Sequence, residues 1–259
     1  MYRQTMNRNA GFTLIELSIV LVIIGLIVGG VLVGQDLIKA AEVRATVGQV
    51  EKYNSSMNTF RTKYNGMPGD LLSTSAANFG MTVRTGAAGH GDGNSLVEGC
   101  SAGAIVFGCE TALIWVDLSF ANLIDGSFTT ATDALTQVAA GSQTSYFPSG
   151  KVGRGNYFTV YSSGGLNHYE VTGVTSTSAA GVYTLTTALT PTESFNMDNK
   201  IDDGAPGTGV VTAALSVAAL NVDANYGAGD ACVESATAYN TDTTADANTP
   251  ACQLRFRFN

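Results

Sequence analysis

The chain has 259 residues, of which 45% are hydrophobic and 8% aromatic, and it carries a formal net charge of −8. This length and apolar content are sufficient for a globular domain with its own core, which excludes a chain that is disordered throughout. Because an acidic surface repels phosphate backbones, we expect no nucleic-acid partner.

An apolar stretch near the N-terminus covers residues 12–34 and contains one ionisable side chain, Glu16. A helix of this length, at about 1.5 Å per residue, covers roughly the 30 Å hydrocarbon core of a bilayer. Residues 1–10 carry Arg3 and Arg8 and no acid, which by the positive-inside rule keeps this end in the cytoplasm. We therefore expect a single membrane-spanning helix, with the remainder of the chain on the other side of the membrane.

Glu16 is unusual because a carboxylate in the middle of a membrane span costs about 2.5–3.5 kcal/mol on insertion scales. One interpretation is that the carboxylate pairs with a positive charge in a low-dielectric environment, which offsets its desolvation. The alternative is that Glu16 lies close enough to the helix end to reach the lipid headgroups.

The basic leader followed by GFTLIELSIVLVIIGLI resembles the signal of the type IV prepilin family, which includes the pseudopilins of type II secretion. The resemblance implies that a prepilin peptidase cleaves between Gly11 and Phe12 on the cytoplasmic side and that the new amino group of Phe12 is then methylated. It also implies that Glu16 attracts the positively charged terminal amine of a neighbouring subunit during assembly.

The family resemblance implies a structural subunit of a type IV pilus-like filament. Its partners would be the prepilin peptidase and methylase, copies of itself and other pilins, the inner-membrane assembly platform and membrane lipid. The precursor is expected in the bacterial inner membrane, and the assembled subunit in an extracellular pilus or a periplasmic pseudopilus. The alternatives are a minor pilin or pseudopilin of type II secretion and a tip adhesin.

A membrane-anchored exported enzyme is a further alternative. The only histidines are His90 and His168, and neither lies in a nucleophile-elbow or zinc-ligand spacing. We therefore expect that the protein is not an enzyme.

The helical pattern continues beyond the span as an amphipathic helix. Its apolar residues recur at spacings of three and four, at Leu37, Ala40, Val43, Val47, Val50, Tyr53, Met57, Phe60 and Tyr64. Asn65, Gly66 and Pro68 then end the helix after about Tyr64. A helix that continues from the membrane half into an amphipathic half resembles the spine of a pilin.

Residues 66–150 are expected to form an inserted α+β region. In it, Asp70 is predicted to cap a short helix that runs to about Phe79, and a second helix is predicted from about Glu110 to Ile124. The apolar face predicted for this second helix consists of Leu113, Val116, Phe120 and Leu123.

The loop before the second helix contains His90-Gly-Asp92-Gly-Asn94, followed by Glu98. Alternate oxygen ligands, a glycine and a later carboxylate resemble half of a calcium loop. The spacing to Glu98 is shorter than in an EF-hand, so a glycine-rich turn with solvated acids is the alternative.

From residue 155 onward the pattern changes to a period of two. The runs NYFTVYSS, NHYEVTGV and VYTLTTALT predict a three-stranded antiparallel meander whose apolar face packs on the spine helix. Thr190-Pro191-Thr192-Glu193 predicts a capping box that opens a helix to about Lys200. GVVTAALSVAAL, residues 209–220, predicts another strand. Together these elements indicate an α+β fold, which resembles that of the pilins.

Two further groups of residues suggest sites in the head. Asp198, Asp202 and Asp203 form a second possible calcium cluster, with solvated acids at a helix end as the alternative. The resemblance implies a C-terminal disulfide loop closed by Cys232 and Cys252. Cys100 and Cys109 could close a small loop of their own, and other pairings of the four cysteines are open.

The domain organisation follows from these elements. It comprises a leader at 1–11, the membrane half of the spine helix at 12–34, its amphipathic half at 35–65, the inserted region at 66–150 and the sheet-containing head at 151–259.

Overall fold

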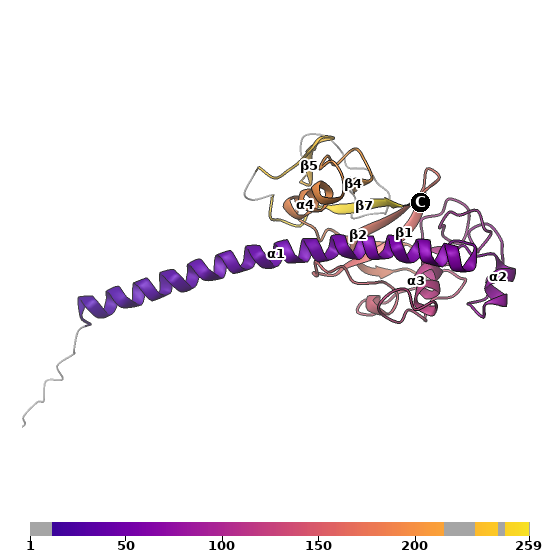
Figure 1. Ribbon diagram of the computed structural model, residues 1–259, viewed down its shortest axis with the longest axis horizontal. Coiled ribbons are helices and arrows are strands. Elements are labelled where there is room, and N and C mark those ends of the chain that lie inside the picture. The colour runs from indigo at the N-terminus through magenta and orange to yellow at the C-terminus, as the bar shows by residue number, and fades with distance from the viewer. Residues whose placement is uncertain (1–11, 215–230, 243–246, 259) are drawn as a thin grey trace, which may run out of the picture. The chain divides into compact units, whose positions relative to one another are not determined.

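The computed structural model describes residues 12–214, 231–242 and 247–258 (Figure 1). The chain divides into two compact units, Met1–Ala41 and Glu42–Asn259. One helix, α1 (Leu14–Tyr64), contributes residues to both units. Asn65 adopts a positive φ of 54° directly after this helix and its N–H bonds the Arg61 carbonyl, as expected for a C-terminal helix stop. The helix therefore ends where the sequence predicts.

In the first unit, the described chain is the N-terminal part of α1. By length and composition alone this helix is long and apolar enough to cross a membrane. Its large apolar side chains are exposed, from Phe12 at 91% to Val33 at 62%. This exposed apolar cylinder is the pattern of a helix whose surroundings are lipid or other helices.

In the second unit, the remainder of α1 has one buried face that begins at Val43. Its buried residues are Val43, Thr46, Val50, Tyr53, Ser56, Met57, Phe60 and Tyr64. The apolar pattern of the amphipathic helix begins earlier, at Leu37, which is 67% exposed. Helical spacing alone does not distinguish residues that pack on their own head from residues left free for another surface.

Tyr53 lies at the centre of the packing between α1 and the head. Its ring centroid is 5.1 Å from that of Trp115 and 5.0 Å from that of Phe158, both in edge-to-face geometry. The Tyr169 ring lies 6.1 Å away. Edge-to-face aromatic pairs contribute beyond their buried area, so this cluster fixes α1 against the sheet.

The main sheet has five strands, all antiparallel to their neighbours: β1 (Asn156–Ser163), β2 (Leu166–Thr177), β3 (Tyr183–Thr186), β4 (Val211–Ala214) and β7 (Gln253–Phe258). β2 is central, with β1 on one side (Figure 1). On its other side, β7 pairs with residues 167–171 and β3 with residues 173–177. The predicted meander of β1, β2 and β3 is confirmed.

The C-terminal strand β7 was not predicted, although QLRFRF alternates apolar and charged residues. It inserts between β2 and β4 and thereby joins the end of the chain to the centre of the head. Of the strand predicted at 209–220, residues 211–214 form β4, and residues 215–220 lie outside the described residues. A second, two-stranded sheet pairs β5 (Val233–Ser235) with β6 (Ala238–Tyr239).

The two short helices in the inserted region have boundaries that differ from the predicted ones. α2 (Ser73–Asn78) has Leu72 as its N-cap, so the prediction that Asp70 caps it was wrong. α3 (Glu110–Phe120) ends four residues before Ile124, because Asn122 adopts a positive φ of 56° just beyond the C-cap. Phe120 is therefore 49% exposed and does not join the buried face. A single 3-10 turn, η1 (Gln143–Ser145), follows in this region.

The capping box of α4 (Pro191–Ile201) is confirmed. The Thr190 hydroxyl accepts the backbone N–H of Glu193 at 3.2 Å, and the Glu193 carboxylate accepts the backbone N–H of Thr190 at 3.0 Å. Arg154 donates to the same carboxylate at 2.5 Å. This contact ties the start of α4 to the turn before β1.

Candidate assembly site and calcium loops

The start of α1 is a capping box formed by Thr13 and Glu16. The backbone N–H of Thr13 donates to Glu16 Oε2 at 2.8 Å, and the Thr13 hydroxyl donates to the same oxygen at 2.7 Å. In return, the Glu16 N–H donates to the Thr13 hydroxyl at 3.3 Å. Sequence reasoning missed this cap, although the spacing Thr-x-x-Glu at the start of an apolar run is its signature.

The cap determines where the Glu16 carboxylate lies. A carboxylate in the first turn is stabilised by the positive end of the helix dipole. Both bonds from Thr13 use Oε2, and among the described residues none donates to Oε1. The group can therefore cap its own helix and still accept a hydrogen bond from outside. Phe12, next to the cap, is 91% exposed, and Gly11 lies outside the described residues.

In the first predicted calcium loop, Asp92 lies with two acids that the sequence did not place there. Oxygen atoms of Asp70, Asp92 and Glu110 lie within 4.8 Å of one another, and Glu98 is outside this group. The Asn94 amide contacts the carboxylates of both Asp92 and Glu98, at 3.2 and 3.3 Å. The predicted residues are neighbours, but the carboxylates that converge are a different set.

Asp70 and Glu110 are buried, and their oxygens hold the loop by its backbone. Asp70 accepts the N–H groups of Gly93 and Ser95 at 2.7 and 2.6 Å. Glu110 accepts those of Gly91 and Glu98 at 2.7 and 2.9 Å. Burial raises the pKa of both carboxyls, and the repulsion between them adds to the shift for Glu110. Since all four oxygens already accept N–H groups, this set fits a structural clasp for the loop better than a cation site.

The second predicted group consists of three acids that lie close together in the structure. One carboxylate oxygen each from Asp198, Asp202 and Asp203 lies within 4.8 Å of the other two. Burial, together with the neighbouring acids, raises the pKa of Asp198 to about 6, although hydrogen bonds from Tyr239 and Gly204 act in the opposite direction. Hydrogen bonds reach the other two carboxylates as well, because Asp202 accepts the Val210 N–H and Asp203 accepts the Thr208 hydroxyl. Unlike the first set, this one contains an exposed acid, Asp203, and a donor set made only of carboxylate oxygens fits calcium.

The four cysteines pair within their own regions. Cys100 bonds Cys109 in the inserted region, and Cys232 bonds Cys252 in the C-terminal part of the head. The second bond joins the β5 region to the start of β7, so it closes the C-terminal loop that the family resemblance implies.

The N-terminal part of the chain matches a known protein-family model. Residues 6–32 match the prokaryotic N-terminal methylation motif, the type IV prepilin-type signal, and this range includes Gly11, Phe12 and Glu16. No curated protein and no solved structure matches the chain. The motif and the apolar helix fit a membrane-anchored precursor. The chain therefore carries a type IV prepilin-type signal at the start of a pilin-like α+β fold.

Proposed function

We propose that the chain is a structural subunit of a type IV pilus-like filament, rather than an exported enzyme. The observation that carries the proposal is the prepilin-type signal, which lies directly on a capped, span-length helix. In this function the leader is removed between Gly11 and Phe12, Phe12 is methylated, and the exposed apolar part of α1 packs against the same part of other subunits.

Glu16 has a defined task in this function. Cleavage before Phe12 creates a positively charged amine close to the first turn of α1. In a filament that amine needs a negative partner in an apolar environment, and the free Oε1 of a neighbouring Glu16 can supply it. The membrane holds the subunit before assembly, and the extracellular pilus or periplasmic pseudopilus receives it afterwards.

Intact-mass analysis of the protein from its native membrane or filament fraction tests the proposal. We expect the loss of residues 1–11 and a gain of one methyl group on Phe12. An intact N-terminus in cells with an active prepilin peptidase would overturn the proposal in favour of a simple membrane-anchored exported domain.

A variant at the cleavage site sharpens this test. We expect Gly11→Leu to block leader removal, because a peptidase that must close on the backbone needs a small residue there. Gly34→Leu is the matched control, since it adds the same side chain to the same apolar stretch, where nothing lies within 4 Å of a new Cβ. Mature mass for the Gly11 variant, or precursor mass for both, would contradict the assignment of the cleavage site.

We also propose that Asp198, Asp202 and Asp203 hold a calcium ion that orders the loop after α4. Support comes from the convergence of three carboxylates, of which Asp198 is buried in its folded position. A bound divalent cation favours the ionised form of each carboxylate and so offsets the repulsion among them.

The calcium proposal predicts a pH effect of known sign. Because the folded-state pKa of Asp198 is about 6 and its ordinary value is 3.8, this group stabilises the fold below about pH 4. That stability is lost as the pH rises through 6. Thermal unfolding of the full chain with a chelator, repeated across this pH range, measures the effect. We expect the midpoint of wild type to fall relative to that of Asp198→Asn as the pH rises through 6. Calcium at pH 7 should raise the midpoint of wild type only. An equal calcium response in the Asp198 variant would contradict the site, and Asp125→Asn serves as the control.

A further inference from the structure

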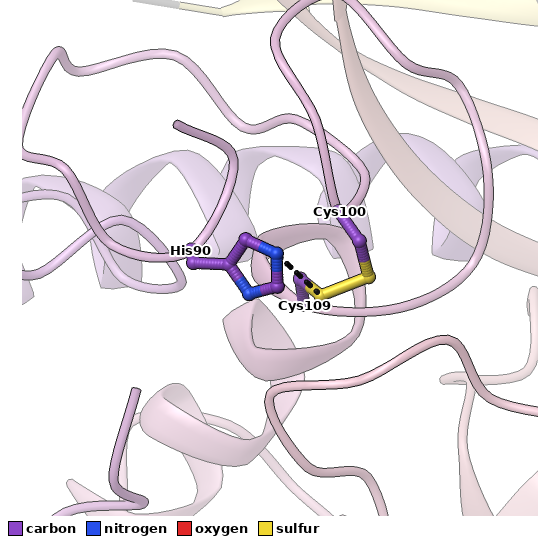
Figure 2. A group of neighbouring side chains, drawn as sticks. All are labelled: His90, Cys100 and Cys109. Atoms are coloured by element: carbon purple, nitrogen blue, oxygen red, sulfur yellow. Dashed lines mark hydrogen bonds between the residues drawn. A yellow bond between two sulfur atoms is a disulfide. The ribbon is translucent and has the colours of Figure 1, made fainter. Parts of the chain in front are cut away.

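The inserted region brings four chemistry-bearing side chains together at the first disulfide. His90 Nδ1 lies 2.8 Å from Asp133 Oδ1, and His90 Nε2 lies 3.8 Å from Cys109 Sγ. Cys109 is bonded to Cys100 (Figure 2). The imidazole therefore lies between a carboxylate and a sulfur atom, in the order in which a nucleophilic cysteine, its base and an orienting acid are arranged.

Cys109 occupies a strained position at the start of a helix. It is the N-cap of α3, with φ 54° and ψ −123°, outside the regions that ordinary residues prefer. Gly108 forms a bridge with Leu135, and the Cys109 N–H donates to the Ala134 carbonyl at 3.3 Å. These contacts hold the sulfur at the positive end of the helix dipole, which stabilises a thiolate.

The His90 side is fixed independently. The backbone N–H of Thr85 donates to Asp133 Oδ2 at 2.7 Å, so the carboxylate is oriented by one oxygen and holds His90 by the other. A Cβ on Gly89 would lie 2.2 Å from the Gly99 carbonyl oxygen, which means that the loop carrying His90 packs directly on the loop carrying Cys100. The Asp133 contact and the packing of the two loops thus place the imidazole beside the disulfide.

Access to the two sulfur atoms differs. Cys109 is fully buried, whereas Cys100 is partly exposed, and the His90 side chain is 20% exposed. Cys100 is therefore the more accessible of the two cysteines to an external thiolate. In disulfide exchange, the sulfur that is not attacked must leave as a thiolate, and its stability as an anion sets the rate.

We propose that Cys100–Cys109 is a thiol–disulfide exchange site. At this site a small-molecule or protein thiol forms a mixed disulfide with Cys100 and releases the Cys109 thiolate next to His90. The incoming thiolate sulfur bonds the Cys100 sulfur, and the Cys100–Cys109 bond breaks. Its electron pair leaves with Cys109, where the His90 imidazole and the N-terminus of α3 stabilise the thiolate. Attack by Cys109 on the mixed disulfide restores the original bond and expels the thiol, so the site is reversible.

This inference does not depend on the filament function, and its test measures one bond. Full-length protein in detergent is incubated with reduced glutathione, quenched with an alkylating agent at intervals and analysed by peptide mass mapping. The Cys232–Cys252 bond in the same molecule is the internal reference. We expect glutathione on Cys100 and the alkyl group on Cys109, with the reverse placement excluded.

The variants isolate the contribution of His90. We expect His90→Gln to slow opening of the Cys100–Cys109 bond about tenfold relative to wild type, because the leaving Cys109 thiolate loses the imidazole beside it. Asp133→Asn should slow it by a smaller factor, since the ring stays oriented but loses its charged partner. Ser101→Ala, which changes an exposed side chain beside the attacked cysteine, is the control and should leave the rate unchanged.

The direction of the change distinguishes exchange chemistry from a packing role. If His90 only packs the loop, its loss loosens the loop and speeds reduction. Faster or unchanged opening in the His90 and Asp133 variants, or glutathione on Cys109, would overturn the proposal. The Cys232–Cys252 bond should open at the same rate in all variants. A change there would identify general unfolding, and the rate at which the Cys100–Cys109 bond opens in Asp133→Asn would then test the proposal.

Discussion

Replacing Glu16 by Gln is expected to abolish filament assembly while leaving membrane insertion intact. Gln can still accept the N–H of Thr13, because either Glu or Gln completes a capping box. The variant therefore keeps the helix start and removes only the charge. Leaving the amine of a neighbouring subunit unpaired in an apolar environment costs about 3–5 kcal/mol, which is at least about a hundredfold in subunit affinity.

The comparison with Thr13→Val separates the two uses of the carboxylate. This variant keeps the charge of Glu16 and removes the hydroxyl that bonds it, so we expect a modest loss of assembly. Ser18→Ala, which removes a hydroxyl bonded to the Ile15 carbonyl, controls for the loss of a polar group in the span. Sheared filament yield measures assembly, and alkaline extraction of membranes measures insertion.

Two results would contradict this account. Wild-type filament yield in the Gln variant would show that charge pairing does not drive assembly. Equal losses in the Glu16 and Thr13 variants would assign the effect to the helix cap and not to the neighbouring amine.

The sequence was sufficient for the features that depend on local patterns. The apolar span, the helix end at Tyr64, the strands β1 and β2 and the Thr190 cap each follow from spacing or from stop chemistry within a few residues. The Thr13 cap could have been recognised in the same way, from its Thr-x-x-Glu spacing.

Features that join distant segments could not be predicted. Asp70 and Glu110 are 40 positions apart, and nothing in either local sequence indicates that both hold the backbone of one loop. The partner of His90 is equally remote, because Asp133 lies 43 positions further along the chain. A residue that its local sequence identifies as a solvated acid or a helix cap has a different role when the fold brings it next to a distant partner.

The fully buried ion pair of Arg84 and Asp117 is the strongest case of this kind. Both side chains are 0% exposed, and the guanidinium donates to both carboxylate oxygens, at 2.8 and 3.1 Å. Arg84 also donates to the Gly69 carbonyl, and Asp117 accepts the Gly69 N–H. The pair thus joins the chain after α1, the loop after α2 and the interior of α3.

We expect Asp117→Asn to destabilise the head by about 3–5 kcal/mol, because it leaves the Arg84 charge buried without its partner. For a domain of this size, that loss lowers the thermal midpoint by roughly 6–20 °C. Unfolding of the full-length protein in detergent, followed by near-UV circular dichroism of Trp115, measures it. Asp125→Asn is the control, since it removes one acid from the exposed pair with Lys52 and should leave the midpoint almost unchanged.

The double variant Arg84→Met, Asp117→Leu decides how the pair acts. If the charge left behind causes the loss, replacing both partners by apolar residues of similar volume restores much of the stability. A double variant as unstable as Asp117→Asn would instead show that the hydrogen bonds to Gly69 carry the effect, because the apolar pair leaves the N–H and carbonyl of that residue without their side-chain partners. An unchanged midpoint in Asp117→Asn would contradict both explanations and would mean that the inserted region is held by its apolar core alone.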